Sequence, residues 1–326
     1  MKPRIGFLGV GWIGRIRMEA AVATGLIEAI AICDPSAEMV PAAVALAPSA
    51  KIVASLDAML AEDVDGVVIA TPSALHAAQA IEALQAGAAV FCQKPMGRSA
   101  EEVRHVVSTA KSADRLLSVD LSYRFTEGVQ HIRAMIARGE LGRIFAVDLT
   151  FHNAYGPDKS WFYDKMQAGG GCMTDLGIHL VDLAFWMLDR SDVEEISGAL
   201  FARGVRITGK SDHVEDFGTA TLRLTDGAVV RVACSWNLHA GQNAVIDASI
   251  YGSKGGAAFR NIGGSFFDFT AERFRGTARE TLCKPPDNWG GRAIEDWCRR
   301  LAAGERFSSE AEELVRLHRV LDSIYE

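Results

Sequence analysis

The feature that most constrains the fold is a glycine-rich turn placed directly after an apolar segment. Residues Arg4–Leu8 are predicted to form a short strand, and Gly9-Val-Gly11-Trp-Ile-Gly14 follows it and opens a helix. Gly9 permits a tight turn, Gly11 lets a bound group approach the backbone, and Gly14 lets the helix pack against the sheet. A strand, this turn and a helix in that order predict a Rossmann-type domain.

The same turn predicts a dinucleotide cofactor. The free N–H groups of Trp12 and Ile13 would face a pyrophosphate at the helix N-terminus. Asp34 ends the second predicted strand, 20 residues beyond Gly14, where a carboxylate can accept hydrogen bonds from the ribose hydroxyls of adenosine. A 2′-phosphate would be repelled there, and the adjacent Pro35-Ser36 offers no arginine to receive it. We therefore expect NAD rather than NADP; a turn that binds nothing and an Asp34 that only caps a helix are the alternatives.

Strands and helices alternate as far as residue 121, which is typical of βαβ units in a parallel sheet. The helical segments between the strands include residues 75–86 and 99–113. We expect an α/β fold with a doubly wound, NAD-binding Rossmann domain over residues 1–121. The six strands that we predict there are Arg4–Leu8, Glu28–Cys33, Lys51–Val53, Gly66–Ala70, Ala89–Cys92 and Leu116–Asp120.

Beyond residue 121 the pattern changes to strands joined by turns. A helix over Thr126–Arg138 precedes a long strand, and Leu222–Val232 predicts a hairpin around Asp226-Gly227, a pair suited to a tight primed turn. Two helices, Gly291–Ala302 and Ser309–Tyr325, close the sequence. We expect residues 122–326 to form an α+β domain with an open, mostly antiparallel sheet that serves substrate binding and oligomerisation.

Charge and cysteine usage exclude several classes of protein. The net charge is −7 and no stretch clusters Lys and Arg, which argues against a nucleic-acid partner. No apolar run approaches the roughly 18 residues of a membrane helix, and no signal peptide is recognised, so we expect a cytoplasmic protein without a membrane partner. No CxxC pair suggests a zinc or redox centre, and we expect no metal. The scattered cysteines are Cys33, Cys92, Cys172, Cys234, Cys283 and Cys298.

Three further motifs accompany the glycine turn. Ala70-Thr-Pro-Ser-Ala-Leu-His76 follows the fourth predicted strand, Cys92-Gln-Lys-Pro95 follows the fifth, and Gly169-Gly-Gly-Cys-Met-Thr-Asp-Leu-Gly-Ile-His179 lies in the second domain. Their order and spacing resemble the Gfo/Idh/MocA family of NAD(P)-dependent oxidoreductases, which acts mainly on sugars, inositols and their derivatives. The resemblance covers nearly the whole chain.

The resemblance implies a catalytic group made of Lys94, Asp175 and His179. The sequence departs from the family pattern at Gln93, where the motif has glutamate. An amide keeps a similar shape and hydrogen-bonding reach but loses the charge. The departure leaves the tuning of Lys94 open.

The chemistry of these residue types suits alcohol oxidation. A group must remove the hydroxyl proton while hydride leaves the carbon for the nicotinamide, and a histidine such as His179 titrates near neutral pH. Lys94, at the carboxyl end of a parallel strand, could polarise the reacting oxygen. Asp175, four residues before His179, would share its helical face and orient the imidazole or hold a substrate hydroxyl. Lys94 and His179 could exchange roles.

Other residues are weaker candidates. Thr71, Pro72 and His76 are expected to line the cofactor site together with Lys94, and a His76 satisfied at a helix start is the alternative. Asp182, three residues beyond His179, could assist it or lie on a solvated helix face.

Two candidates for substrate contacts lie outside the motifs. Arg124 belongs to Tyr123-Arg124-Phe125, which resembles a family segment near the active site, and Trp161 could offer an aromatic face to a sugar ring or serve packing alone. With Lys94, Asp175 and His179 they form the expected substrate-binding set.

The leading functional hypothesis is reversible hydride transfer between NAD and a secondary alcohol of a sugar, inositol or related polyol. Two alternatives stay open: sugar elimination or hydrolysis assisted by a bound NAD that is regenerated in each cycle, and a non-catalytic NAD-binding regulator. The open sheet would expose a large face that family members commonly bury, so a homodimer or homotetramer is expected.

Overall fold

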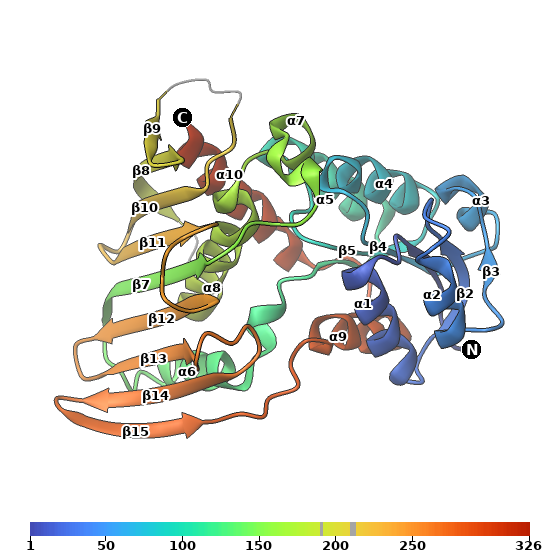
Figure 1. The fold of residues 1–326 in the computed structure, drawn as a ribbon. Coiled ribbons are helices and arrows are strands. Elements are labelled where there is room, and N and C mark those ends of the chain that lie inside the picture. The colour runs from blue at the N-terminus through green and yellow to red at the C-terminus, as the bar shows by residue number, and fades with distance from the viewer. Residues whose placement is uncertain (190–191, 209–212) are drawn as a thin grey trace. The chain divides into compact units, whose positions relative to one another are not determined.

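The computed structural model describes residues 1–189, 192–208 and 213–326 (Figure 1). The chain forms two compact units: residues 1–120 with 290–315, and residues 121–289 with 316–326. We expected the second domain to contain everything after residue 121. Residues 290–315 instead return to the first unit, because the fully buried Trp297 packs its ring against Phe91 with the ring centroids 6.0 Å apart.

The first unit is built on a parallel sheet, as predicted. Its six strands lie in the order β3-β2-β1-β4-β5-β6, the doubly wound order of Rossmann domains, and each pairs with its neighbours in parallel. The strands run within a residue of the predicted bounds. They are β1 (Arg4–Leu8), β2 (Glu28–Cys33), β3 (Lys51–Ile52), β4 (Gly66–Ile69), β5 (Ala89–Cys92) and β6 (Leu117–Val119).

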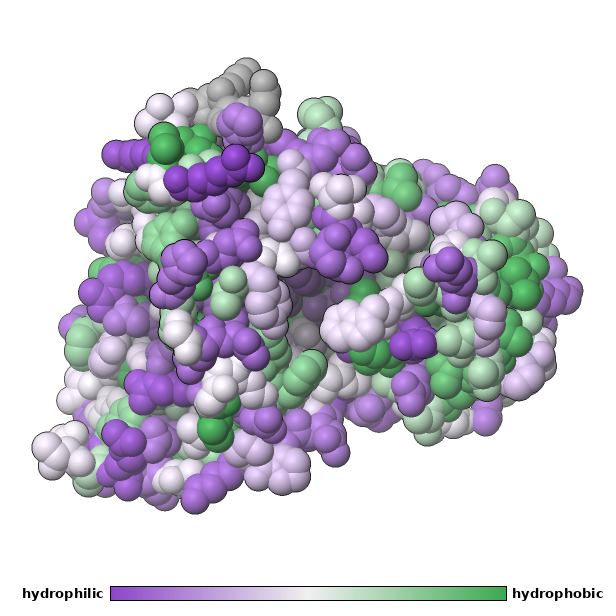
Figure 2. Space-filling model, viewed as in Figure 1, coloured by the Kyte–Doolittle hydropathy of each residue, from purple (hydrophilic) through white to green (hydrophobic). Residues whose placement is uncertain are grey.

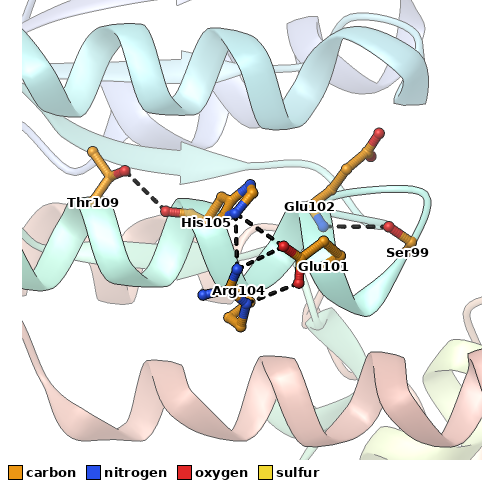
Figure 3. Close-up of polar contacts among 6 residues, drawn as sticks. All are labelled: Ser99, Glu101, Glu102, Arg104, His105 and Thr109. Atoms are coloured by element: carbon orange, nitrogen blue, oxygen red, sulfur yellow. Dashed lines mark hydrogen bonds and ion pairs between the residues drawn. The ribbon is translucent and has the colours of Figure 1, made fainter.

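Helices cover both faces of this sheet, with α4 and α5 on one side and α9 on the other (Figure 1). The N-terminal turn of α5 is stabilised locally, as Figure 3 shows: the Ser99 hydroxyl accepts the N–H of Glu102 at 3.3 Å, and Glu101 pairs with Arg104 and His105. The guanidinium of Arg104 lowers the pKa of Glu101. The helices are α1 (Trp12–Ala23), α2 (Val40–Leu46), α3 (Leu56–Leu60), α4 (Ser73–Gln85), α5 (Ala100–Ala113) and α9 (Arg292–Ala302).

The second unit contains a nine-stranded sheet, called here the large sheet, in the order β15-β14-β13-β12-β7-β11-β10-β8-β9. Its pairings are antiparallel except between β7 and β11, so the expected open, mostly antiparallel sheet is confirmed. The strands are β7 (Ile144–Asn153), β8 (Val193–Ala202), β9 (Val205–Ile207), β10 (Phe217–Leu224), β11 (Val229–Ser235), β12 (Ala244–Gly252), β13 (Gly256–Asn261), β14 (Phe269–Arg275) and β15 (Ala278–Cys283).

Alternation along β7 decides which face of the large sheet is covered. Val147, Leu149 and Phe151 are buried, and the strand contacts α8. Apart from α9, the helical elements that follow residue 121 are η1 (Ser122–Phe125), α6 (Glu127–Ala137), η2 (Ser160–Tyr163), α7 (Lys165–Ala168), η3 (Met173–Gly177), α8 (Ile178–Leu188), η4 (Ser309–Glu312) and α10 (Glu313–Tyr325).

The β10–β11 hairpin forms with a wider turn than we predicted. Gly227 has a φ of +86° and donates its N–H to the Leu224 carbonyl, while Leu224 donates to the Ala228 carbonyl. A primed turn would need positive φ at Asp226 as well, which is not observed. The prediction of a tight primed turn was therefore wrong, and a longer loop with one left-handed glycine closes the hairpin.

The helical segment Lys165–Leu188 is long and apolar enough to cross a membrane, but 89% of its apolar window is buried inside the protein. That burial is typical of a core helix. On the face seen in Figure 2, hydrophilic side chains are spread over the second unit, with apolar ones scattered among them.

Candidate active site

The glycine turn after β1 holds three glycines for three different reasons. Gly9 has a φ of +85°, and a Cβ there would lie 2.5 Å from the carbonyl oxygen of Ala70. A Cβ on Gly14 would lie 2.1 Å from the Gly9 carbonyl oxygen. A Cβ on Gly11 would meet no atom of the described residues within 4 Å. Gly9 and Gly14 are thus required by close backbone packing, whereas Gly11 faces open space.

The N-terminus of α1 offers donors to that space. Its first helical hydrogen bond runs from the Arg15 N–H to the Gly11 carbonyl at 2.9 Å, so the N–H groups of Trp12, Ile13 and Gly14 lack acceptors within the helix. The first turn carries no acidic residue, and the helix dipole adds partial positive charge. These groups fit a dinucleotide diphosphate.

Asp34 is engaged by the backbone around it. One carboxylate oxygen accepts the Val10 N–H at 2.7 Å, and the other accepts the Ser36 N–H at 2.8 Å. Asp34 therefore braces the glycine turn in addition to lying at the end of β2. An ionised carboxylate has further lone pairs that can accept ribose hydroxyls.

His76 connects two loops of the first unit and is buried. Its Nδ1 contacts the Pro95 carbonyl oxygen at 2.7 Å and its Nε2 contacts the Thr71 carbonyl oxygen at 2.6 Å. Burial lowers the pKa of His76, although the two carbonyl contacts oppose this effect. Both ring nitrogens are engaged within the protein, which agrees with a satisfied histidine. Thr71 donates its hydroxyl to Gln79 at 2.6 Å, and Pro72 caps α4.

Lys94 follows β5 and is flanked by a buried polar cluster that we did not predict. The side-chain amide of Gln93 donates to Asp120, and the same carboxylate oxygen accepts the Nε–H of Arg17 at 2.5 Å. All three side chains of this cluster are buried. On the other side of Lys94, the peptide bond to Pro95 is cis. Arg17 and Asp120 are 103 residues apart, so sequence spacing gave no signal for their contact.

Asp175 and His179 lie on consecutive helical turns, as the spacing predicted. Asp175 belongs to a single π-helical turn, η3, and His179 lies in the first turn of α8, which continues it. Short π-helical turns within α-helices are frequent at functional sites. The carboxylate of Asp175 accepts the indole N–H of Trp236 at 3.1 Å. Trp236 was not among the predicted residues, because it lies 61 residues from Asp175 in the sequence.

Aromatic rings surround the imidazole of His179. Tyr123 meets it edge-on with ring centroids 5.1 Å apart, and Phe151 lies 6.4 Å away. Burial raises the pKa of the Tyr123 hydroxyl, and the charge of Asp175 adds to the effect. The Tyr123 hydroxyl is therefore a neutral group beside the histidine.

Arg124 has an intramolecular partner. It makes a forked ion pair with the buried Asp182, with Nε 2.9 Å and 3.1 Å from the two carboxylate oxygens. Burial raises the pKa of Asp182, and Arg124 opposes that shift. Asp182 is thus neither solvated nor placed as an aid to His179: it anchors the segment that carries Tyr123 to the helix that carries His179.

Trp161 begins a stack of aromatic rings that leads to Asp175. It stacks on Phe162 at 3.9 Å, Phe162 meets Trp236 edge-on at 6.3 Å, and Trp236 donates to Asp175. Tyr163 also contacts Trp236, at 5.6 Å. Trp161 therefore belongs to a wall of aromatic rings that extends to Asp175.

Glu215 fixes the turn that precedes η3. Its buried carboxylate accepts the N–H groups of Gly171 and Met173 at 3.0 and 2.8 Å and the Tyr325 hydroxyl at 2.7 Å. A Cβ on Gly171 would lie 1.9 Å from the Glu215 carbonyl oxygen, so only glycine fits. Burial raises the pKa of Glu215, and the bonds that it accepts oppose this shift. Glu215 caps the helical segment of Asp175 and His179 from 44 residues away, a contact that local sequence patterns do not reveal.

The candidate residues are thus divided between the units. Lys94 and the expected cofactor-binding residues belong to the first unit, whereas Arg124, Trp161, Asp175 and His179 belong to the second. Within the described ranges, no group of three His, Cys, Asp or Glu side chains is placed to hold a metal ion.

Comparison with known proteins agrees with this division. Residues 3–121 match the family description "Oxidoreductase family, NAD-binding Rossmann fold", and residues 129–258 match the "GFO/IDH/MocA C-terminal domain". D-glucoside 3-dehydrogenase of Escherichia coli K12 is 26% identical over 266 residues, covering 78% of this chain and 76% of that protein. Inositol 2-dehydrogenase of Rhizobium meliloti 1021 is 28% identical over 267 residues, covering 80% and 76%.

A solved structure shows the same fold over nearly the whole length. Levoglucosan dehydrogenase, in a complex with NADH and levoglucosan, superposes with a TM-score of 0.85 at 22% identity, covering 99% of this chain and 96% of that one. Because both halves of the sequence match domains of one family and the fold agrees throughout, the chain belongs to the Gfo/Idh/MocA family of oxidoreductases.

Proposed function

We propose that this protein transfers a hydride between NAD(P) and a secondary alcohol of a sugar, inositol or related polyol. The observation that carries the proposal is that a chain of this family has both an open helix N-terminus at Gly11 in its first unit and a buried His179, four residues after Asp175, in its second. The relatives reported above act on a D-glucoside and on inositol, as their names state. Polyhydroxylated substrates also suit the aromatic wall beside Asp175.

His179 acts as the general base in this proposal. It accepts the proton of the reacting hydroxyl as the carbon becomes a carbonyl, and it returns that proton in the reverse direction. Lys94 supplies an ammonium that stabilises negative charge on the reacting oxygen. Asp175, held by Trp236, orients a substrate hydroxyl or the imidazole. The N-terminus of α1 at the glycine turn would hold the dinucleotide, which would supply the acceptor or donor of the hydride.

The direct test is a screen of glucosides, inositols and free sugars with NAD and with NADP, following the absorbance of the reduced cofactor. We expect turnover with at least one polyhydroxylated substrate. Binding of cofactor without reduction across the whole panel would contradict the proposed function.

NAD is the cofactor that we propose over NADP, because Asp34 places a negative charge at the end of β2. Asp34→Asn is expected to lower the preference for NAD about tenfold, or about 1.4 kcal/mol, by removing the repulsion of a 2′-phosphate. Calorimetric titration with each cofactor measures this ratio.

Asp34 also holds the glycine turn through Val10, so weaker binding of both cofactors would report damage to the turn rather than altered selectivity. Ser36→Ala, which leaves both backbone bonds to Asp34 intact, is the matched control. An unchanged ratio of the two dissociation constants in Asp34→Asn would refute the role of Asp34.

Two further expectations complete the proposal. The protein works in the cytoplasm, where thiols such as the buried Cys172 and Cys234 stay reduced. It self-associates through the open face of the large sheet as a homodimer or homotetramer. Light scattering after size-exclusion chromatography should give the mass of two or four chains, and a monomer would contradict the second expectation.

A further inference from the structure

Three buried polar side chains form a cluster that includes Gln93, the residue before the lysine that the proposed function uses. Arg17 comes from α1, Gln93 follows β5, and Asp120 follows β6, so three elements of the parallel sheet unit meet at one carboxylate. One oxygen of Asp120 receives both donors, and the other is buried without a hydrogen-bond partner among the described residues. The cluster therefore contains one positive group, Arg17, one negative group, Asp120, and one neutral amide, Gln93, and the carboxylate accepts hydrogen bonds from the other two.

The backbone on both sides of Lys94 is held by buried side chains. Gln93 is tied to Asp120 by its amide, and its backbone N–H donates to the Ile69 carbonyl at 2.9 Å. The Pro95 carbonyl contacts His76. Because Gln93 and Pro95 on either side of Lys94 make these contacts, the backbone of Lys94 cannot shift without breaking a buried polar contact. Breaking such a contact is costly.

The charge balance explains why residue 93 is an amide. A glutamate at this position would place a second buried carboxylate against Asp120, with Arg17 as the shared cation. Two such carboxylates cannot both stay ionised without a large cost, so one would take up a proton. Gln93 has the shape of glutamate and donates a hydrogen bond where glutamate would repel.

We propose that Arg17, Asp120 and Gln93 form a positioning unit for Lys94, in which Asp120 carries the negative charge and Gln93 transmits its position to the lysine. The inference rests on the proposed function, because it assigns the cluster to the reaction in which Lys94 takes part. Arg17 lies on the helix that the glycine turn opens, so the unit also ties Lys94 to the cofactor-binding helix.

The test exchanges the carboxylate of Asp120 and the amide of Gln93, first one at a time and then together. Gln93→Glu and Asp120→Asn are each expected to lower kcat about tenfold or more, because one creates two facing carboxylates and the other leaves Arg17 without its buried counter-ion. In the double variant, the carboxylate stands at residue 93 and the amide at residue 120, so the two side chains have exchanged their chemistry. We expect its kcat to recover most of the loss seen in the worse single variant. Gln85→Glu, at the exposed end of α4, is the control and should match the wild type.

The pH dependence of Gln93→Glu separates positioning from simple damage. Burial and the charge of Asp120 raise the pKa of a glutamate at this position, and below that pKa its protonated carboxyl donates to Asp120 as the amide does. The ratio of variant to wild-type kcat should therefore rise as the pH falls. Arg17 stays charged throughout, and burial keeps the neighbouring Cys92 thiol neutral.

A second readout needs no turnover. Competitive labelling of amines, read at Lys94 by mass spectrometry, reports the fraction of neutral lysine. Added negative charge in Gln93→Glu should slow labelling, whereas loss of the Asp120 charge should speed it, and the double variant should return toward the wild type. Absence of wild-type turnover would defeat the proposed function while leaving this readout intact. Unchanged labelling in both single variants, or a double variant no better than the worse single one, would overturn the positioning unit.

Discussion

Replacing His179 with alanine is expected to lower kcat by about 10²- to 10⁴-fold, the range for loss of a general acid or base. The imidazole lies at the start of α8 against Tyr123, so alanine removes the proposed proton acceptor and leaves the helix itself in place. Cofactor affinity should stay unchanged, since the glycine turn belongs to the first unit. Steady-state kinetics with a substrate found in the screen, together with calorimetric titration of the cofactor, measures both quantities.

The matched control is His131→Ala on α6, whose side chain is 46% exposed. This variant makes the same substitution at a histidine outside the candidate site, so it should keep the wild-type kcat. A kcat of His179→Ala within threefold of wild type would contradict the proposed role of His179. A parallel fall in cofactor affinity would indicate a general loss of structure instead.

Replacing Glu215 with alanine is expected to have the largest effect on stability, a loss of about 3 to 5 kcal/mol in the free energy of unfolding. The substitution leaves the N–H groups of Gly171 and Met173 and the hydroxyl of Tyr325 without the acceptor that they share. The segment around Gly171 and η3 then lose their cap, so kcat should fall as well because Asp175 and His179 follow on the same helical segment. Urea unfolding gives the free energy, and kinetics below the transition gives kcat.

Glu194→Ala is the control for Glu215. This residue is exposed on β8 and pairs with Arg223 at 3.6 Å, and a surface ion pair contributes only about 0 to 1 kcal/mol. Equal losses of stability in the two variants would show that the hydrogen bonds of Glu215 stabilise the fold no more than a surface ion pair does. Tyr325→Phe, which removes one donor and keeps the ring, should fall between them.

Features set by neighbouring residues could be predicted from the sequence. The strand bounds of the parallel sheet follow from short apolar runs, and the requirements at Gly9 and Gly14 follow from where the turn lies between strand and helix. The four-residue spacing of Asp175 and His179 predicted their common helical segment, although a π-helical turn was not foreseen. In each case the physical cause acts within a few residues.

Features set by distant partners could not be predicted. In the sequence, nothing distinguishes Glu215 from a surface carboxylate. Only the fold, in which Glu215 lies just before β10, places it against Gly171. Asp182 and Arg124 each looked available for chemistry, yet their mutual ion pair engages both. Buried charge demands a partner, but the sequence does not say which of many charges supplies it.

Helix α9 has a consequence for how the protein is made. The ribosome synthesises all six parallel strands early, and residues 292–302 emerge only after the large sheet is complete. Until then Phe91 and Gly66 lack the Trp297 ring that covers them in the finished fold. The nascent first unit therefore keeps this apolar surface uncovered while the whole large sheet is synthesised, and chaperones can recognise such a surface.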